Sequence, residues 1–102
     1  MKESEVLVVR VYLHEAATHL DDMLGYLHDE HRVRGVTVFR GITGFGVSGE
    51  YHSSTLIDMS LDLPVVIEFF DEPAKVKAII EQLNSSVKPG HIVYWPATIN
   101  AE

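Results

Sequence analysis

The order of strand-like and helix-like segments leaves this chain few folds to adopt. Apolar residues at steps of three and four predict a helix over 18–31, with Thr18 as its N-cap. A second helix is predicted from Pro73, a favourable first helical residue, to about Val87. No regular pattern is found over 43–63, so a long loop is expected there. Runs rich in β-branched and apolar residues predict four strands, at 6–13, 36–42, 65–70 and 91–95.

This βαββαβ order predicts an α+β protein with a ferredoxin-like fold. The expected structure is a single domain, residues 1–102, in which two helices cover one face of a four-stranded antiparallel sheet. The predicted strands are apolar on both faces, although a solvated sheet face should alternate with polar residues. We therefore expect the uncovered face to be buried against other subunits.

Charge and composition exclude several classes of protein. The chain has no cysteine, which excludes disulfide scaffolds, thiolate zinc sites and cysteine nucleophiles. Its formal net charge of −7 has the wrong sign for a general nucleic-acid or anionic-membrane binder. No apolar run approaches the ~20 residues that span a bilayer, and the first residues lack the apolar core of a signal peptide. We therefore expect a cytoplasmic protein without direct membrane insertion.

One acidic residue stands in the middle of a predicted strand. Glu68 lies between Ile67 and Phe69, and a carboxylate buried at such a position needs a partner. Arg10 or Arg40, on neighbouring strands, can supply the opposite charge. A structural ion pair is the favoured interpretation.

The long loop begins with clustered glycines. Residues 44–49 match the pattern G-x-G-x-x-G, but a dinucleotide-binding fold requires a helix directly afterwards, and 50–60 is too irregular for one. A flexible glycine loop is therefore favoured over a Rossmann motif. Clustered glycines also allow backbone N–H groups to approach an anion, to which Arg40 would add charge.

Evidence for metal binding or catalysis is thin. Among six histidines, His52 in the loop is the strongest candidate ligand, together with Glu50 and Asp58. The sequence contains no H-E-x-x-H motif, and its loop serines lie in no G-x-S-x-G nucleophile elbow. We expect no enzymatic activity.

Three segments together resemble a known family. The stretch GVTVFRGITGFG (35–46), then Tyr51-His52-Ser53, then DLPVVIEFFDEP (62–73), is similar to the domain-of-unknown-function family 190, which belongs with the PII-like signalling proteins. The resemblance covers nearly the whole chain. It implies a ferredoxin-like protomer assembled as a homotrimer, with an adenine nucleotide bound in clefts between subunits. It further implies that the mobile loop of about 43–63, the T-loop, signals to a protein partner such as a membrane transporter or channel.

The resemblance also assigns candidate ligand-binding residues to the base of the loop and to the start of the last strand. His91 stands where PII proteins have a phosphate-binding lysine, and the arginines near the PII C-terminus are missing. A nucleotide with few phosphates, such as a monophosphate, fits this reduced charge best. The alternative is a divalent-metal-binding trimer resembling CutA, with His52, Glu50 and Asp58 as ligands. The candidate ligand-binding residues are Thr37, Arg40, Gly41, Gly44, Phe45, Gly46, Gly90 and His91.

Overall fold

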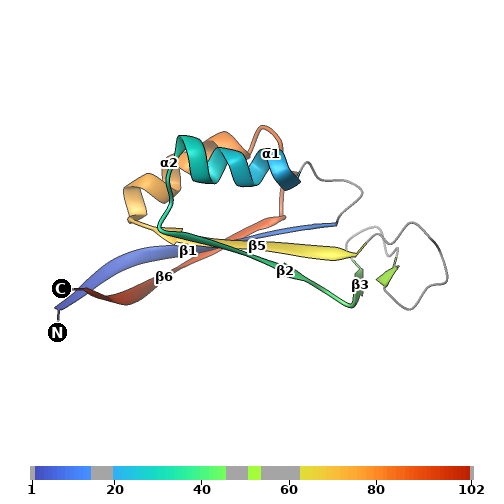
Figure 1. Cartoon of the computed structure of the whole chain (residues 1–102), viewed down its shortest axis with the longest axis horizontal. Coiled ribbons are helices and arrows are strands. Elements are labelled where there is room, and N and C mark those ends of the chain that lie inside the picture. Colours follow the sequence, from blue (N-terminus) through green and yellow to red (C-terminus); the bar gives the residue numbers. More distant parts are fainter. Residues whose placement is uncertain (1, 15–19, 46–50, 54–62, 102) are drawn as a thin grey trace.

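The computed structural model describes residues 2–14, 20–45, 51–53 and 63–101. Four long strands, two short ones and three helical segments follow one another in these ranges (Figure 1). Their bounds are β1 (Lys2–His14), α1 (Leu20–Gly25), the π-helix η2 (Tyr26–Glu30), β2 (Gly35–Arg40), β3 (Thr43–Phe45), β4 (Tyr51–Ser53), β5 (Pro64–Asp71), α2 (Pro73–Leu83) and β6 (Ile92–Ala101).

The long strands form one antiparallel sheet in the order β2-β5-β1-β6. Figure 1 shows α1 and α2 side by side above this sheet, with no described segment below it. The two outer strands, β2 and β6, are the sheet edges. The ferredoxin-like architecture predicted from the order of segments is confirmed.

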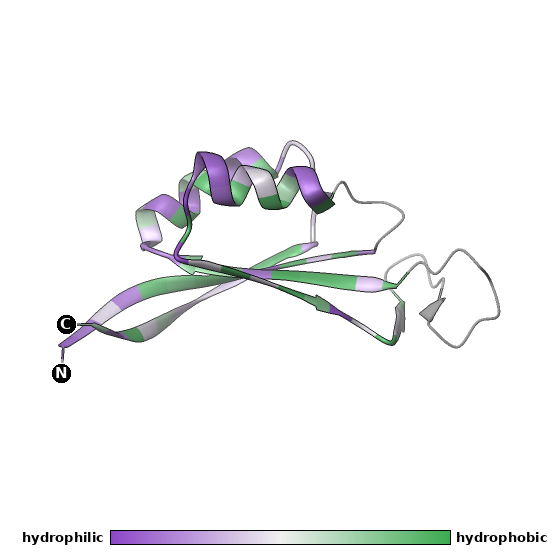
Figure 2. Cartoon of the chain, in the orientation of Figure 1, coloured by the Kyte–Doolittle hydropathy of each residue, from purple (hydrophilic) through white to green (hydrophobic). Residues whose placement is uncertain are grey.

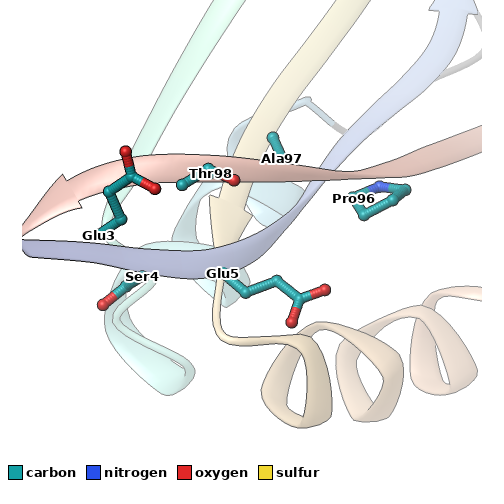
Figure 3. Close-up of a pocket in the computed structure, with 6 residues that line it drawn as sticks. All are labelled: Glu3, Ser4, Glu5, Pro96, Ala97 and Thr98. Carbon is teal, nitrogen blue, oxygen red and sulfur yellow. The ribbon is translucent and has the colours of Figure 1, made fainter.

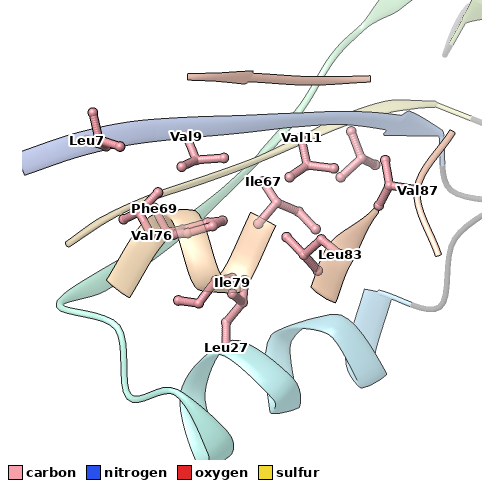
Figure 4. Packing of buried hydrophobic residues seen from close by; sticks show 11 residues of the cluster. Leu7, Val9, Val11, Leu27, Ile67, Phe69, Val76, Ile79, Leu83 and Val87 are labelled. Carbon is pink, nitrogen blue, oxygen red and sulfur yellow. The ribbon is translucent and has the colours of Figure 1, made fainter. Parts of the chain in front are cut away.

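The core lies between the helices and the upper face of the sheet (Figure 4). Buried and less buried side chains alternate along β1 and β5, so that every second side chain points to the helices. Helix α2 packs against them with apolar residues at steps of three and four. Burying each of these side chains contributes about 1.5–3 kcal/mol. The fully buried residues at this interface are Val9, Val11, Val65, Ile67, Phe69, Val76, Ile79 and Leu27.

The first helix differs from the single α-helix predicted over 18–31. Its described part is a short α-helix that changes at Gly25 into the π-helix η2. The N–H of His31 donates to the carbonyl of Tyr26, five residues back, at 3.2 Å. This wider turn keeps Leu27 in the core, and a spacing of three and four does not distinguish it from an α-helical turn. The predicted N-cap, Thr18, lies outside the described residues.

The second helix ends earlier than predicted. Its last residue is Leu83, and Asn84 is the C-cap. Val87 was predicted on the helical stripe and is indeed buried, but a turn brings it there: its N–H donates to the carbonyl of Leu83 at 2.9 Å.

The last strand is longer than predicted. It continues through Pro96 to Ala101, where the sequence suggested an end at Trp95. Because β6 is an edge strand, the missing N–H of a proline is tolerated on its outer side. β1 correspondingly begins at Lys2, and the two strands extend beyond the helices as a ribbon that ends near both termini (Figure 1).

The expectation of no strand over 43–63 was wrong in part. Thr43–Phe45 pairs in antiparallel fashion with Tyr51–Ser53, with Gly44 opposite His52. Strands of three residues are too short to show a period of two in the sequence. Residues 46–50 and 54–62 lie outside the described part of the chain.

Candidate ligand-binding site

Two glycines allow the chain to turn tightly where β2 leads into β3. The N–H of Gly41 donates to the carbonyl of Pro64 at 2.7 Å. A Cβ atom at Gly41 would lie 2.7 Å from Cγ of Pro64, and one at Gly44 would lie 3.3 Å from the same atom. Both glycines are therefore explained by close packing on Pro64, a reason that sequence reasoning did not identify.

Large apolar side chains are exposed beside these glycines. Ile42 is 76% exposed and Phe45 is 64% exposed. Arg40 ends β2 and is exposed at the same place. The described loop base thus presents cationic and apolar groups together, which suits a ligand with both an anionic and a flat apolar part. Thr37 lies further back on β2, and Gly46 lies outside the described residues.

The other predicted residues lie at the start of β6. Gly90 has a φ of +84°, a left-handed conformation that favours glycine. His91 follows it and accepts a backbone hydrogen bond from Tyr12 at 2.8 Å. Its Nδ1 lies 2.9 Å from the carbonyl oxygen of Tyr12. This contact uses a backbone atom, so no motif in the sequence could have revealed it.

Both groups of residues lie at the same end of the sheet, but on opposite edges. Arg40 ends β2 opposite Val65, and His91 directly precedes β6 beside Tyr12. β5 and β1 lie between β2 and β6, and three strand spacings amount to about 14 Å. One copy of the chain therefore does not bring Arg40 and His91 together around one small anion.

The uncovered face of the sheet is apolar. Tyr12, Phe39, Val93 and Trp95 are between 39% and 47% exposed on this face. In Figure 2 the sheet strands are largely coloured as hydrophobic, on a sheet whose lower side no described helix covers. Large apolar side chains exposed together on one sheet face are typical of an interaction surface. We call this face the open face.

An ion pair lies in the middle of the open face. Nε of Arg10 lies 2.8 Å from Oε1 of Glu68, which confirms that Glu68 has an arginine partner and identifies it as Arg10. The Arg10 guanidinium also lies 5.6 Å from the ring centre of Phe39, within cation–π range. Hydrogen bonds to Glu68 and then to Tyr12 raise the pKa of Arg10. These contacts therefore favour the charged form of Arg10.

The alternative metal site is not tested by the described residues. Within them, no three His, Asp or Glu side chains gather closely enough to hold a metal ion. His52 lies on β4, of which the structure gives the backbone, whereas Glu50 and Asp58 lie outside the described ranges.

A concavity lies far from the loop base, between the extended ends of β1 and β6 (Figure 3). Its volume is about 370 Å³. It contains two carboxylates and no basic side chain, so it is unsuited to a phosphate. Its lining residues are Glu3, Ser4, Glu5, Pro96, Ala97 and Thr98.

The fold is PII-like. Its antiparallel sheet carries two helices on one face, and a long segment joins β2 to β5. CPII from Thiomonas intermedia K12, a nitrogen regulatory PII-like protein bound to ADP, AMP and bicarbonate, has this fold: it is 18% identical, with a TM-score of 0.69, over 98% of this chain and 91% of that one. CutA1 from Oryza sativa is also similar in structure, at 14% identity and a TM-score of 0.60, over 96% of this chain and 83% of that one.

The family is defined by sequence. The model of the DUF190 family, described as "Uncharacterized ACR", matches residues 6–99, and the chain belongs to this family. A UPF0166 protein from Aquifex aeolicus (strain VF5) is 32% identical over 94 residues, which cover 92% of this chain and 93% of that protein. The predicted family is therefore confirmed. No helix in the described ranges has the length and apolar character required to cross a membrane.

Proposed function

We propose that this protein is a PII-like regulator, a homotrimer that binds an adenine nucleotide in the clefts between its subunits. The observation that carries the proposal is the division of the predicted site between opposite sheet edges. Arg40 at one edge and His91 at the other are about three strand spacings apart in one copy, or about 14 Å. Two adjacent copies can place the β2 edge of one beside the β6 edge of the next.

The open face supplies the reason for assembly. In a monomer, the exposed parts of Tyr12, Phe39, Val93 and Trp95 contact water. This exposure costs about 25 cal/mol of free energy for each Å² of apolar surface. Burial of this face against other copies removes that cost. It also places the Arg10–Glu68 pair inside the interface, where both partners keep their hydrogen bond.

The adenine nucleotide is proposed from two observations. The structure of CPII, which has the same fold, contains ADP and AMP. The described loop base here offers Arg40 for a phosphate and the exposed Phe45 ring for a base. Charge near this site is limited, since the described basic residues after Arg40 are Lys75, Lys77 and Lys88. A monophosphate fits this charge better than a triphosphate.

The proposed regulator acts by binding and not by catalysis. Its nucleotide would favour one conformation of the loop over 43–63, and that conformation would bind a protein partner, with a cytoplasmic part of a transporter or channel as the candidate class. A ligand shifts such an equilibrium only as far as its affinities for the two conformations differ.

The first test is calorimetric titration of the purified protein with AMP and ADP. We expect saturable binding of AMP. Arg40→Ala should weaken it by about 10- to 100-fold, because a hydrogen bond to a charged group contributes roughly 1.5–3 kcal/mol. Lys77→Ala is the matched control: it removes the same charge from an exposed position on α2 and should leave binding unchanged. Absence of nucleotide binding would overturn the proposal.

A panel of divalent cations separates the alternative function. If a cation alone raises the melting temperature, and His52→Ala abolishes that rise, the CutA-like metal site replaces the nucleotide site. CutA1 shares this fold at a TM-score of 0.60, so the fold is compatible with either outcome.

A further inference from the structure

The ring of His91 is held in one orientation by the backbone of β1. Its Nδ1 lies 2.9 Å from the carbonyl oxygen of Tyr12. A carbonyl oxygen has no proton to donate, so Nδ1 must be the donor in this hydrogen bond. The contact therefore determines the tautomer: when His91 is neutral, its proton is on Nδ1 and not on Nε2.

The turn before His91 holds the residue in place. The N–H of His91 donates to the carbonyl of Lys88 at 3.2 Å, and Tyr12 donates its N–H to the carbonyl of His91 at 2.8 Å. Gly90 has the positive φ that this turn requires. Both the backbone and the ring of His91 are thus tied to their neighbours.

The opposite ring nitrogen, Nε2, is left for a ligand. Among the described residues it has no hydrogen-bond partner. In neutral His91 this atom carries a lone pair and accepts hydrogen bonds, so it repels a phosphate oxygen. In protonated His91 it becomes a charged N–H donor and attracts one.

We propose that His91 makes nucleotide binding depend on protonation, so that the ligand's phosphate is bound by the imidazolium form through Nε2. The inference rests on the proposed function and adds its regulation. Histidine changes charge between about pH 5 and 8, unlike a lysine at the same position. Where His91 is neutral before the ligand arrives, nucleotide binding is therefore coupled to proton uptake.

The groups nearest to His91 are consistent with this role. Tyr12 and His14 lie on the adjacent strand β1, and Lys88 lies in the preceding turn. No carboxylate in the described chain forms an ion pair with His91. The anion that stabilises the imidazolium is thus the ligand's phosphate and not a described side chain of the same copy.

The test compares AMP binding by the wild type, His91→Lys and His91→Asn at pH 6.0 and 8.0, at one ionic strength. Lysine keeps a charge at both values. Asparagine places an amide near Nδ1, where it can still donate to the Tyr12 carbonyl, and it cannot be protonated. The phosphate of AMP titrates identically in all three experiments, so the ratio of affinities between proteins isolates His91.

We expect the wild-type affinity, divided by that of His91→Lys, to fall by at least about fivefold from pH 6.0 to 8.0. The affinity of His91→Asn, divided by that of His91→Lys, should be the same at pH 6.0 and 8.0. Calorimetry of the wild type in buffers of different ionisation enthalpy should show uptake of protons at pH 7, beyond the uptake by His91→Asn. That measurement tests the inference even if His91→Lys does not fold.

Two results would overturn the inference, and they differ from each other. If the wild type and His91→Asn show the same pH dependence and the same proton uptake, His91 is not the titrating contact, while the proposed nucleotide site stands. If the wild type binds no nucleotide at either pH, the proposed function fails and the inference fails with it.

Discussion

Gly41 and Pro64 are in contact at the base of the long loop, and the contact leaves no space for a side chain. A Cβ at Gly41 would lie 2.7 Å from Cγ of Pro64, whose ring cannot move independently of the backbone. We expect Gly41→Ala to lower the free energy of unfolding by about 1–3 kcal/mol, as overpacking does. Urea denaturation measures this change. Gly35→Ala is the control, since a Cβ at Gly35 on β2 would meet nothing within 4 Å; an equal loss there would refute the packing explanation.

Asp71 is a buried carboxylate that connects three parts of the chain. It accepts hydrogen bonds from Lys75 Nζ at 2.9 Å, from Glu72 N–H at 2.8 Å and from Arg34 N–H at 3.2 Å. Burial by itself raises the pKa of Asp71, but these hydrogen bonds outweigh it, and the net pKa lies below the usual value. The pair of β5 and α2 is thereby connected to the segment that leads into β2.

Because the folded-state pKa of Asp71 is lowered, its ionisation stabilises the fold above the pKa of the unfolded chain, about 3.9. That stability is lost as the pH falls through the folded-state value. We expect Asp71→Asn to cost roughly 1–3 kcal/mol at pH 7, and the difference from wild type to shrink below about pH 4. Urea denaturation at pH 7 and pH 3 measures it, with the exposed Lys77→Ala as control. A difference that is independent of pH would contradict this account.

Helix α2 begins without a side-chain cap. Its N-cap is Glu72, whose side chain makes no capping hydrogen bond, and Pro73 follows at the first helical position. Serine has a shorter side chain that reaches the free N–H groups of the first turn. We expect Glu72→Ser to raise the free energy of unfolding by about 0.5–1 kcal/mol, measured as a shift of the urea midpoint. Glu81→Ser removes the same charge inside the helix and should not stabilise it; a gain of similar size there would contradict the capping argument.

Assembly is decided by the open face. If that face is the interface between copies, a charge placed on it must be buried without a partner, which costs far more than a surface substitution. We expect Phe39→Glu on β2 and Trp95→Glu on β6 each to convert the oligomer into monomers, measured by sedimentation velocity. Ala78→Glu on the exposed side of α2 is the control and should leave the mass unchanged. A wild type that sediments as a monomer would contradict the proposed trimer.

Local patterns in the chain were sufficient for the order of the long strands and the helices and for the apolar stripes at Val9, Ile67 and Ile79, because alternation and helical spacing act between neighbouring residues. They indicated an arginine partner for Glu68 but left Arg10 and Arg40 open, and the pairing of β1 with β5 decided for Arg10. They did not reveal the π-helix at Tyr26–Glu30, the passage of β6 through Pro96, or the short strands at the loop base. The π-helix depends on which carbonyl the N–H of His31 contacts, and apolar spacing of three and four does not distinguish this turn from an α-helical one. The strands depend on pairing with other segments, which the pattern within one segment does not show.

The predicted ligand-binding residues show the same division. The charge of Arg40 beside the clustered glycines, and the family resemblance at His91, were enough to propose both residues as ligand contacts, and these assignments remain predictions. Sheet order, which arises from pairing between segments far apart in the chain, placed them on opposite edges. The tautomer of His91 depends on a carbonyl group 79 positions away. Because every residue has a backbone carbonyl, the sequence does not indicate which carbonyl the ring of His91 contacts. Only the folded arrangement of β1 and β6 decides this.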